Sequence, residues 1–175
     1  MSSSTEKNRQ SKTSEFQENL EILRQIQFFS GLHLEALKVI AYLCVRETFR
    51  PGDYLFQKDD NDGKAFYIVS GEAALMREDK SGESPQENYV EGEFVGSLAL
   101  LSDMHRLFSL KALTDMTCLI LTRDKFAKVM EQFPDLMPKV LKSVVDSVRA
   151  WEERLLVDQD GFCEACRQKA GVSLI

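Results

Sequence analysis

The residues best suited to chemistry lie between positions 92 and 106. Gly96 precedes a short run of helix formers, Ser97 to Leu101, and Arg106 follows in the same loop. The N-terminus of a helix presents unpaired backbone amides and a positive dipole end, and a glycine lets an anion approach the main chain. A guanidinium can bind two phosphate oxygens at once and stays charged at any working pH. The segment therefore predicts an anion site; the plainer interpretation is a structural turn followed by a surface arginine.

A second pattern is the close cysteine pair near the end of the sequence, Cys163 and Cys166. Structural zinc takes four ligands, and Cys44 and Cys118 stand alone in the sequence, so the pair offers only half a site. We expect free thiols and no metal; the alternative is a zinc ion shared across a dimer, with two thiolates from each subunit. The sequence contains no nucleophile elbow, P-loop, paired-histidine metalloprotease helix or dinucleotide fingerprint, which predicts a protein that is not an enzyme.

Composition narrows the class of protein further. The 22 basic and 28 acidic residues give a net charge of −6, which disfavours nucleic acid as a partner because phosphate neutralisation needs clustered lysine and arginine. No run of about eighteen apolar residues occurs, so no membrane partner is expected. The first residues lack the apolar core of a signal peptide, and this predicts a cytoplasmic location.

The residue pattern changes along the chain, and each pattern predicts a different element around residues 92–106. Residues 1–14 are polar without an apolar repeat, and we expect a disordered tail there. Apolar residues at helical spacing predict one helix from Phe16 and a second from Leu34. Short segments rich in β-branched and aromatic residues then alternate with turns, as in an antiparallel sandwich or barrel, and residues 80–85 are expected to be a polar loop. The predicted strands cover residues 45–49, 54–56, 65–69, 73–76, 108–113 and 117–122.

Helical spacing returns after Arg123, and a long last helix is predicted after Pro134, since proline suits the first turn of a helix. Its apolar residues recur at spacings of four and three, as in the contact seam of a coiled coil. Burial of this seam against the barrel is one interpretation, and a parallel homodimer through the helix is the other. The predicted organisation is a tail over residues 1–14, one domain over 15–157, and a C-terminal tail over 158–175 with the cysteine pair. The seam consists of Met137, Leu141, Val144, Val148, Trp151 and Leu155.

The order of these elements and several stretches of sequence resemble the cyclic-nucleotide-binding domain family of catabolite-activator-type regulators, cyclic-AMP-dependent kinase regulatory subunits and nucleotide-gated channels. The likeness spans about residues 25–156. It implies a mainly β fold with flanking helices: a double-stranded β-helix, or jelly-roll, barrel with N-terminal helices, a short cassette helix and a long C-terminal helix. The stretches that carry the likeness are residues 28–32, 49–53, 65–71 and 96–101, and Arg106.

The resemblance also implies a role for the segment from Gly96 to Arg106. In that family a phosphate-binding cassette occupies this position, so the amides of Gly96, Leu98 and Ala99 would cradle a phosphate that Arg106 clamps. The implied ligand is cAMP, cGMP or a related nucleotide, and the C-terminal helix would pass on the signal. The implied function is a regulatory, ligand-sensing module without a cofactor. The alternative is a degenerate, ligand-free fold that acts as a dimerisation or protein-interaction scaffold.

Three positions of the cassette depart from the family pattern. Ser97 stands where the family has a glutamate that accepts a hydrogen bond from the ribose 2′-hydroxyl, and Leu107 and Phe108 replace small residues after Arg106. Loss of a charged hydrogen bond is expected to weaken binding by about one to two orders of magnitude. Two bulky side chains would narrow the pocket if they point inward. Trp151 matches an aromatic lid over the base, although its place in the seam favours a packing or dimer contact.

Overall fold

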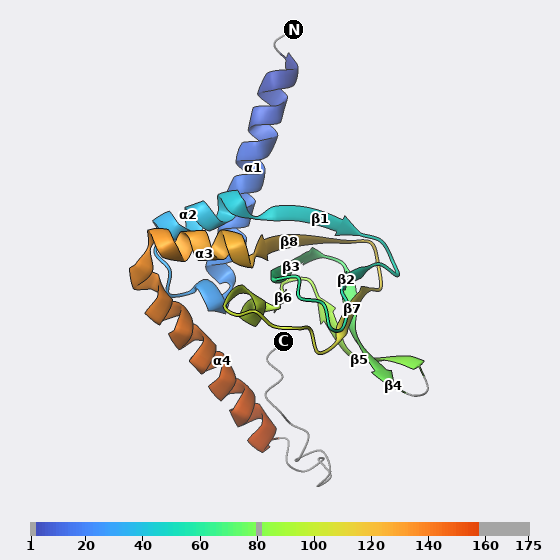
Figure 1. The fold of residues 1–175 in the computed structure, drawn as a ribbon. Coiled ribbons are helices and arrows are strands. Elements are labelled where there is room, and N and C mark those ends of the chain that lie inside the picture. The colour runs from blue at the N-terminus through green and yellow to red at the C-terminus, as the bar shows by residue number, and fades with distance from the viewer. Residues whose placement is uncertain (1–2, 80–81, 158–175) are drawn as a thin grey trace.

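Two four-stranded antiparallel sheets form the centre of the structure (Figure 1), a computed structural model that describes residues 3–79 and 82–157. The first sheet has the order β1 (Val45–Phe49), β8 (Met116–Thr122), β3 (Lys64–Ser70), β6 (Phe94–Val95). The second has the order β2 (Tyr54–Phe56), β7 (Ser109–Ala112), β4 (Glu72–Asp79), β5 (Gly82–Val90). Buried residues from both sheets form one core between them, so the predicted mainly β barrel fold is confirmed.

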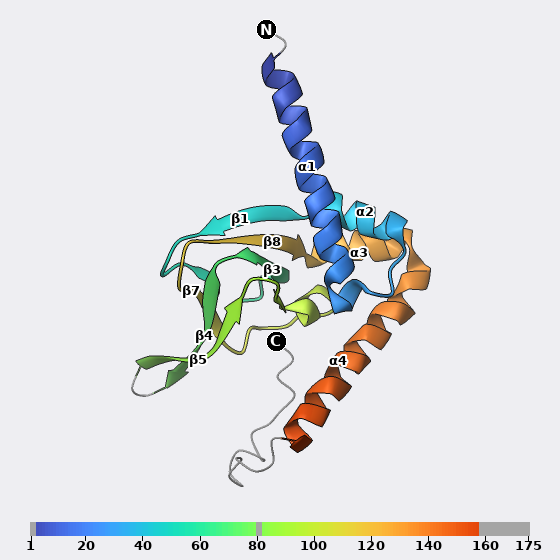
Figure 2. The same ribbon diagram turned by 180° about the vertical axis from the view of Figure 1, so that it is seen from behind.

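Helices cover one side of the barrel, seen from both sides in Figures 1 and 2. They are α1 (Ser3–Gln25), η1 (Gln27–Phe29), α2 (Leu34–Leu43), α3 (Arg123–Gln132), η3 (Pro134–Leu136) and α4 (Met137–Val157), where η marks a 3-10 helix. A further 3-10 helix, η2 (Ser97–Leu100), follows β6. None of the helices in the described part of the chain is long and apolar enough to cross a bilayer.

Strand β3 connects the barrel core with the helical layer, because successive side chains of a strand point to opposite faces. Phe66 and Ile68 are fully buried in the core between the sheets. Ala65 and Tyr67 belong instead to the core beneath the helices. A single strand is thus buried on both faces, which explains why its sequence is a nearly continuous apolar run.

Four phenylalanines join the helices to the segment that precedes the candidate anion site. The rings of Phe28 and Phe29 in η1 lie 5.0 Å apart, and the ring of Phe94 in β6 lies 5.5 Å from that of Phe29. The ring of Phe126 in α3 lies 5.9 Å from that of Phe28. Edge and tilted ring contacts at these distances stabilise beyond the area they bury. The cluster therefore fixes β6, and with it the start of the cassette, against the helical layer.

The N-terminal helix corrects one expectation. The sequence predicted a disordered tail over residues 1–14, whereas α1 begins at Ser3. Residues 6–12 are mostly strong helix formers, Glu, Lys, Arg and Gln, and extending an existing helix by a residue costs far less than starting one. The absence of an apolar repeat was therefore a poor guide to where the helix begins.

Strand β5 is a second correction, since residues 80–85 were expected to be a polar loop. Gly82–Val90 pairs along β4, with Pro85 opposite Met76 next to a register shift. Strand β5 lies at the edge of its sheet, where a proline is tolerated because one side of the strand needs no ladder hydrogen bonds. Its polar composition reflects solvent on that edge rather than a loop.

Helix α4 divides the predicted seam between two faces. Val144 of the seam packs against the helical core, as do two fully buried residues outside the seam, Leu136 of η3 and Val140 of α4. Met137 and Leu141, which the seam also includes, are 36% and 52% exposed. Among the seam residues whose burial the structure describes, Val144 thus packs inward and Met137 and Leu141 face outward, so burial accounts for only part of the seam.

We predict that Phe29→Ala lowers the free energy of unfolding by about 3–5 kcal/mol, because it empties a site in the aromatic cluster that is only 1% exposed. Urea unfolding followed by circular dichroism measures the change. The matched control is Tyr42→Ala, whose side chain is 81% exposed and whose loss is expected to change stability by at most about 0.5 kcal/mol. Similar losses for both variants would contradict the role of the cluster.

Candidate ligand-binding site

The turn after β6 depends on a glycine. Gly96 has φ 85° and ψ 22°, a left-handed conformation that residues with a Cβ rarely adopt. A Cβ on Gly96 would also lie 2.6 Å from Nη1 of Arg106 and 2.9 Å from the carbonyl oxygen of Lys64. The predicted short helix follows Gly96 as η2, a single 3-10 turn. The guanidinium of Arg106 lies directly beside Gly96. The structure thus brings together the two residues on which the predicted anion site depends.

Arg106 is buried, at 7% exposure, and its guanidinium is held on three sides. Its Nε and Nη2 donate to Oδ1 of Asp62 over 3.1 and 2.8 Å. Nη2 also donates to the carbonyl oxygen of Lys64. The guanidinium carbon lies 4.1 Å from the ring centre of Phe56 and 5.9 Å from that of Phe66, within the range of cation–π attraction.

These contacts divide the five donors of the guanidinium into two groups. Nε and Nη2 are taken up by Asp62 and the Lys64 carbonyl. Among the described residues Nη1 has no hydrogen-bond partner, and it lies nearer to Gly96 than Nη2 does, at 2.6 Å against 3.2 Å from the position of an added Cβ. A planar guanidinium with one side fixed presents the other in a set direction. Arg106 is therefore oriented with two unused N–H groups toward the cassette turn.

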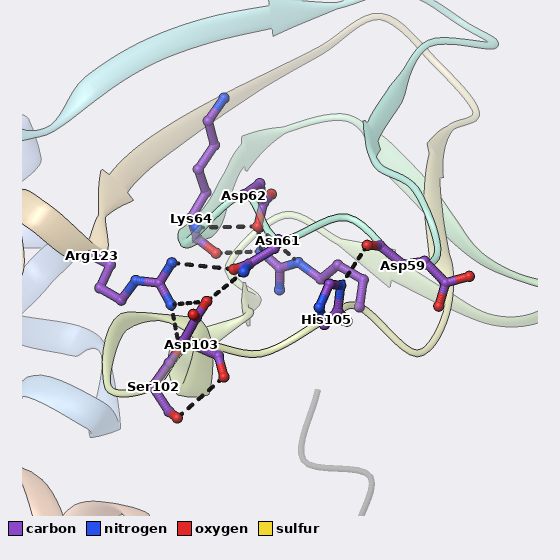
Figure 3. A network of polar contacts seen from close by, with 9 residues as sticks. Asp59, Asn61, Asp62, Lys64, Ser102, Asp103, His105 and Arg123 are labelled. Atoms are coloured by element: carbon purple, nitrogen blue, oxygen red, sulfur yellow. Dashed lines mark hydrogen bonds and ion pairs between the residues drawn. The ribbon is translucent and has the colours of Figure 1, made fainter.

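The loop before β3 and the loop before β7 are fastened to each other by main-chain hydrogen bonds. Asp59 N donates to the carbonyl oxygen of Arg106 over 2.8 Å, and Arg106 N donates to that of Asp60 over 2.9 Å. The Nδ1 of His105 lies 2.8 Å from the carbonyl oxygen of Asp59. Figure 3 shows His105 and Asp59 facing each other across this junction. The backbone of Arg106 is thus fixed as firmly as its side chain.

A second set of contacts ties the same loops to α3 (Figure 3). Arg123 donates through Nη1 to the carbonyl oxygen of Ser102 over 2.7 Å and to Asp103 over 3.2 Å, and through Nη2 to Asn61 over 3.2 Å. Asn61 also donates to Asp103. The hydrogen bond from Asn61 and the charge of Arg123 lower the pKa of the Asp103 carboxyl below its ordinary value. Arg123 and Asp103 thus form an ion pair beside the candidate site.

The remaining cassette residues occupy a different side of the turn. Ala99 is buried, at 1% exposure. Ser97 and Leu98 line a hollow of about 190 Å³ whose other walls come from η1, β6 and α4. Gly96, Leu98 and Ala99 thus lie in one turn, and the side chains of Ser97 and Leu98 line a hollow that α4 also lines.

The two bulky residues after Arg106 point in different directions. Leu107 is 60% exposed and does not enter the barrel. Phe108 is half-buried and packs against the core between the sheets. Both line a hollow of about 130 Å³ together with Lys58, Met76, Arg77 and Ser109. Of the two side chains expected to narrow the pocket, only Phe108 points inward.

Sequence reasoning missed Asp62, which stands 44 positions before Arg106. The sequence of residues 59–63 predicts only a turn. Nothing in it shows which of its three aspartates would pair with Arg106. The available signal was physical: a buried arginine requires a carboxylate or several carbonyls nearby. The predicted lid, Trp151, lies in α4, but the structure does not describe its side chain, and Cys163 and Cys166 lie outside the described residues.

The fold and this arrangement can be compared with known proteins. The sequence model of the cyclic nucleotide-binding domain family matches residues 46–133, which is half of the chain and includes both Asp62 and Arg106. The chain belongs to the cyclic nucleotide-binding domain family.

Relatives with known roles are regulatory subunits and kinases. The chain is 36% identical over 116 residues to the cAMP-dependent protein kinase regulatory subunit of Emericella nidulans, a match over 66% of this chain and 27% of that protein. It is 24% identical over 135 residues to human cGMP-dependent protein kinase 2, a match over 75% of this chain and 18% of that protein. The chain thus spans only 27% and 18% of the length of these two relatives.

Solved structures share the fold. The N-terminal domain of a transcriptional regulator from Streptomyces coelicolor A3(2) matches with a TM-score of 0.68 and 24% identity, over 81% of this chain and 99% of that one. A mutant regulatory subunit of a cAMP-independent protein kinase A from Trypanosoma brucei, bound to cAMP in its A site, matches with a TM-score of 0.59 and 22% identity, over 74% of this chain and 48% of that one. At these identities the likeness concerns the fold alone.

We predict that Gly96→Ala destabilises the domain by about 2 kcal/mol or more, since it combines a left-handed backbone with a close approach to Arg106. Thermal and urea unfolding measure the loss. Gly92→Ala is the matched control, because Gly92 has φ 94° but nothing lies within 4 Å of the added Cβ. The difference between the two variants isolates the crowding of the guanidinium, and equal losses would show that Arg106 does not constrain position 96.

Proposed function

We propose that this domain is a regulatory sensor that binds a cyclic nucleoside monophosphate, or a close relative, through Arg106 and the turn at Gly96. The observation that best supports this proposal is the orientation of the Arg106 guanidinium. Asp62 and the Lys64 carbonyl hold Nε and Nη2, so Nη1 faces the cassette turn with its two N–H groups unused. A phosphate that accepts from Nη1 gains charge-assisted hydrogen bonds without the cost of ordering a long side chain.

The ligand's sugar and base are expected to be held less firmly than its phosphate. Ser97 offers a short neutral hydroxyl where a carboxylate would bind the ribose more strongly. Phe108 presents an aromatic surface at the barrel side of the same loop, where a small residue would leave more space. These two positions support a relatively weak or altered preference among cyclic nucleotides, with the phosphate as the principal contact.

Signal transfer would run from the cassette to α4. Ser97 and Leu98 on one side, and Val144 and Ser147 of α4 on the other, line the same hollow of about 190 Å³. A movement of the turn on ligand binding therefore changes the packing of α4 directly, and a hollow of this size leaves room for α4 to shift. No catalytic step is assigned to the domain; its proposed output is the position of α4.

A homodimer through α4 remains a second proposal, for the exposed part of the helix. Met137, Leu141 and Val145 are 36%, 52% and 57% exposed and lie at successive spacings of four residues, which places them along one face. Such an apolar stripe on a helix suits a helix from a second copy. The pairing would use this stripe rather than the full seam predicted from the sequence.

We predict that cyclic AMP or cyclic GMP raises the melting temperature of the domain and that Arg106→Lys removes most of the gain. At a ligand concentration one hundred times Kd, binding stabilises by about 2.7 kcal/mol, or about 5–10 °C for a chain of this size. Lysine keeps the charge but lacks the planar fork that Asp62 orients. Arg50→Lys, at an exposed position, is the control and should respond like the wild type.

The outcome that contradicts binding is a wild-type protein whose melting temperature does not move with any cyclic mononucleotide at millimolar concentration. The melting temperature of unliganded Arg106→Lys shows whether that variant is folded. A ligand response that survives in a folded Arg106→Lys protein would place the phosphate elsewhere.

We predict that the protein is a dimer by light scattering and that Leu141→Lys makes it monomeric, because a charge in an apolar helix contact must be desolvated. Tyr42→Lys introduces the same charge at a large side chain on α2 that is 81% exposed, and this variant should remain a dimer. A monomeric wild-type protein at high micromolar concentration would refute dimerisation.

A further inference from the structure

We infer that a hollow between α1 and α2 is a ligand site separate from the cassette, for an uncharged aromatic carboxamide. The two helices lie side by side (Figures 1 and 2). The hollow between them measures about 310 Å³, at the lower end of the range for small-molecule pockets. It shares no lining residue with the hollow between the cassette and α4, so the inference does not depend on the proposed function. The lining of this α1–α2 hollow consists of Glu15, Phe16, Asn19, Ala41, Tyr42 and Cys44.

The feature that points to a ligand is the side chain of Asn19, which is only 3% exposed. Its Oδ1 accepts a hydrogen bond from Nε of Arg46 over 3.0 Å. Because a guanidinium can only donate, this contact identifies the amide oxygen and leaves Nδ2 as the other atom. Nδ2 has no hydrogen-bond partner among the described residues, although buried polar groups nearly always have one. The amide of Asn19 therefore has unused N–H donors.

Nδ2 of Asn19 is open to the α1–α2 hollow. Within the described part of the chain, the side-chain polar atom that is fully enclosed without a partner is Oδ2 of Asp62, so Nδ2 of Asn19 is not fully enclosed. A residue that is 3% exposed reaches solvent over a small area only, and Asn19 lines the hollow. That opening is therefore the hollow, and a ligand carbonyl inside it can accept a hydrogen bond from Nδ2.

Glu15 supplies an acceptor on the same face of α1. It stands four residues before Asn19, a spacing that makes two side chains neighbours on a helix. Glu15 is exposed and has no ion-pair or hydrogen-bond partner among the described residues, so its carboxylate can accept from a ligand. The donor of Asn19 and the acceptor of Glu15 match the carbonyl oxygen and the N–H groups of one carboxamide.

Aromatic and apolar side chains form most of the remaining wall. Phe16 packs partly against the helical core, Ala41 is buried, and Tyr42 is 81% exposed. A ligand ring beside Tyr42 would remove apolar surface of both groups from water, and contact between two rings stabilises further. The exposed ring of Tyr42 therefore gains the most buried surface when the hollow is filled.

The hollow offers no free positive charge that would favour an anion. Arg46 is already bound to Asn19, and through Nη2 to Glu18 over 3.1 Å. Lys125 donates to a main-chain carbonyl at the end of α2 over 2.7 Å. Burial raises the pKa of the Cys44 thiol to about 12, so this wall of the hollow is neutral at pH 7. An uncharged ligand suits these surroundings better than a phosphate does.

The test is a titration of the isotope-labelled full chain with benzamide, followed in two-dimensional amide NMR spectra. We expect saturable shifts of the resonances of residues 15–19 and 41–44, with a dissociation constant on the order of millimolar for so small a compound. Benzoate is the matched compound, since it has the same ring but a carboxylate in place of the amide. It has no N–H to donate and is repelled by Glu15, so it should bind at least about tenfold more weakly.

Two variants test the donor and the aromatic wall. Asn19→Asp keeps an oxygen acceptor for Arg46 but replaces the N–H donors by an oxygen that repels the ligand carbonyl. It should weaken benzamide binding at least about tenfold. Tyr42→Ala removes one wall at an exposed position that contributes little to stability, and it should weaken binding by about three- to tenfold.

A third variant tests the acceptor. Glu15→Gln removes the charge that repels benzoate and weakens the hydrogen bond to benzamide, so the preference for benzamide should fall by about threefold or more. Glu131→Gln is the matched control, because it removes the same charge from an exposed position on α3 that does not line the hollow. It should bind both compounds as the wild type does.

Absence of shifts at residues 15–19 and 41–44 with benzamide up to its solubility limit would overturn the inference, as would shifts confined to the cassette. A folded Asn19→Asp protein that binds benzamide as tightly as the wild type would also overturn it. If Asn19→Asp does not fold, unchanged binding to Tyr42→Ala and an unchanged preference in Glu15→Gln have the same meaning. Cyclic AMP takes no part in these measurements, so their outcome leaves the proposed function untouched.

Discussion

A buried arginine has to be surrounded by acceptors, and in this domain that requirement determines much of the structure around the cassette. Arg106 has an oxygen of Asp62 and a carbonyl on one side and the ring of Phe56 on another. Its main chain is bonded to the loop that carries Asp62. Since an unpaired buried guanidinium would cost several kcal/mol, these partners must be assembled together. The glycine at position 96 follows from the same constraint, because only a residue without a Cβ fits against the guanidinium.

The barrel and the helical layer meet at β3 and at the aromatic cluster. Alternate residues of β3 belong to the two cores, and Phe94 brings the strand before the cassette into contact with η1. The candidate site is therefore attached to the barrel through Asp62 and Phe56, and to the helices through Phe94 and Arg123. A change at the cassette has physical routes to both parts of the domain.

The sequence predicted the strands around the barrel well because their apolar runs are bounded by clear turns. Val45–Phe49 and Tyr54–Phe56 agree with the structure at both ends. The edge strand β5 was missed because its side chains meet water and its composition is that of a loop. The N-terminal part of α1 was missed because helix extension needs no apolar face.

For the candidate site, Gly96 and Arg106 were recognisable because the backbone conformation and the charge each demand a particular residue type. Asp62 was not, since the pairing of residues 62 and 106 exists only once β3 and β7 are placed. The directions of Leu107 and Phe108 were open for a similar reason. Neighbouring residues at a strand entrance face opposite sides, and the sequence does not fix which one faces the core.

The pairing of β1 with β8 also bears on how the chain acquires its structure during synthesis. Val45 in the first strand pairs with Ile120 in the last, and β3 likewise pairs with β8. During synthesis β1 and β3 leave the ribosome before β8, so the edge of each strand that pairs with β8 stays unpaired until residue 122 has emerged. Contacts so distant in sequence also make folding slow compared with a helical domain. Nascent chains that end before β8 are thus the form of this protein most exposed to aggregation and proteolysis.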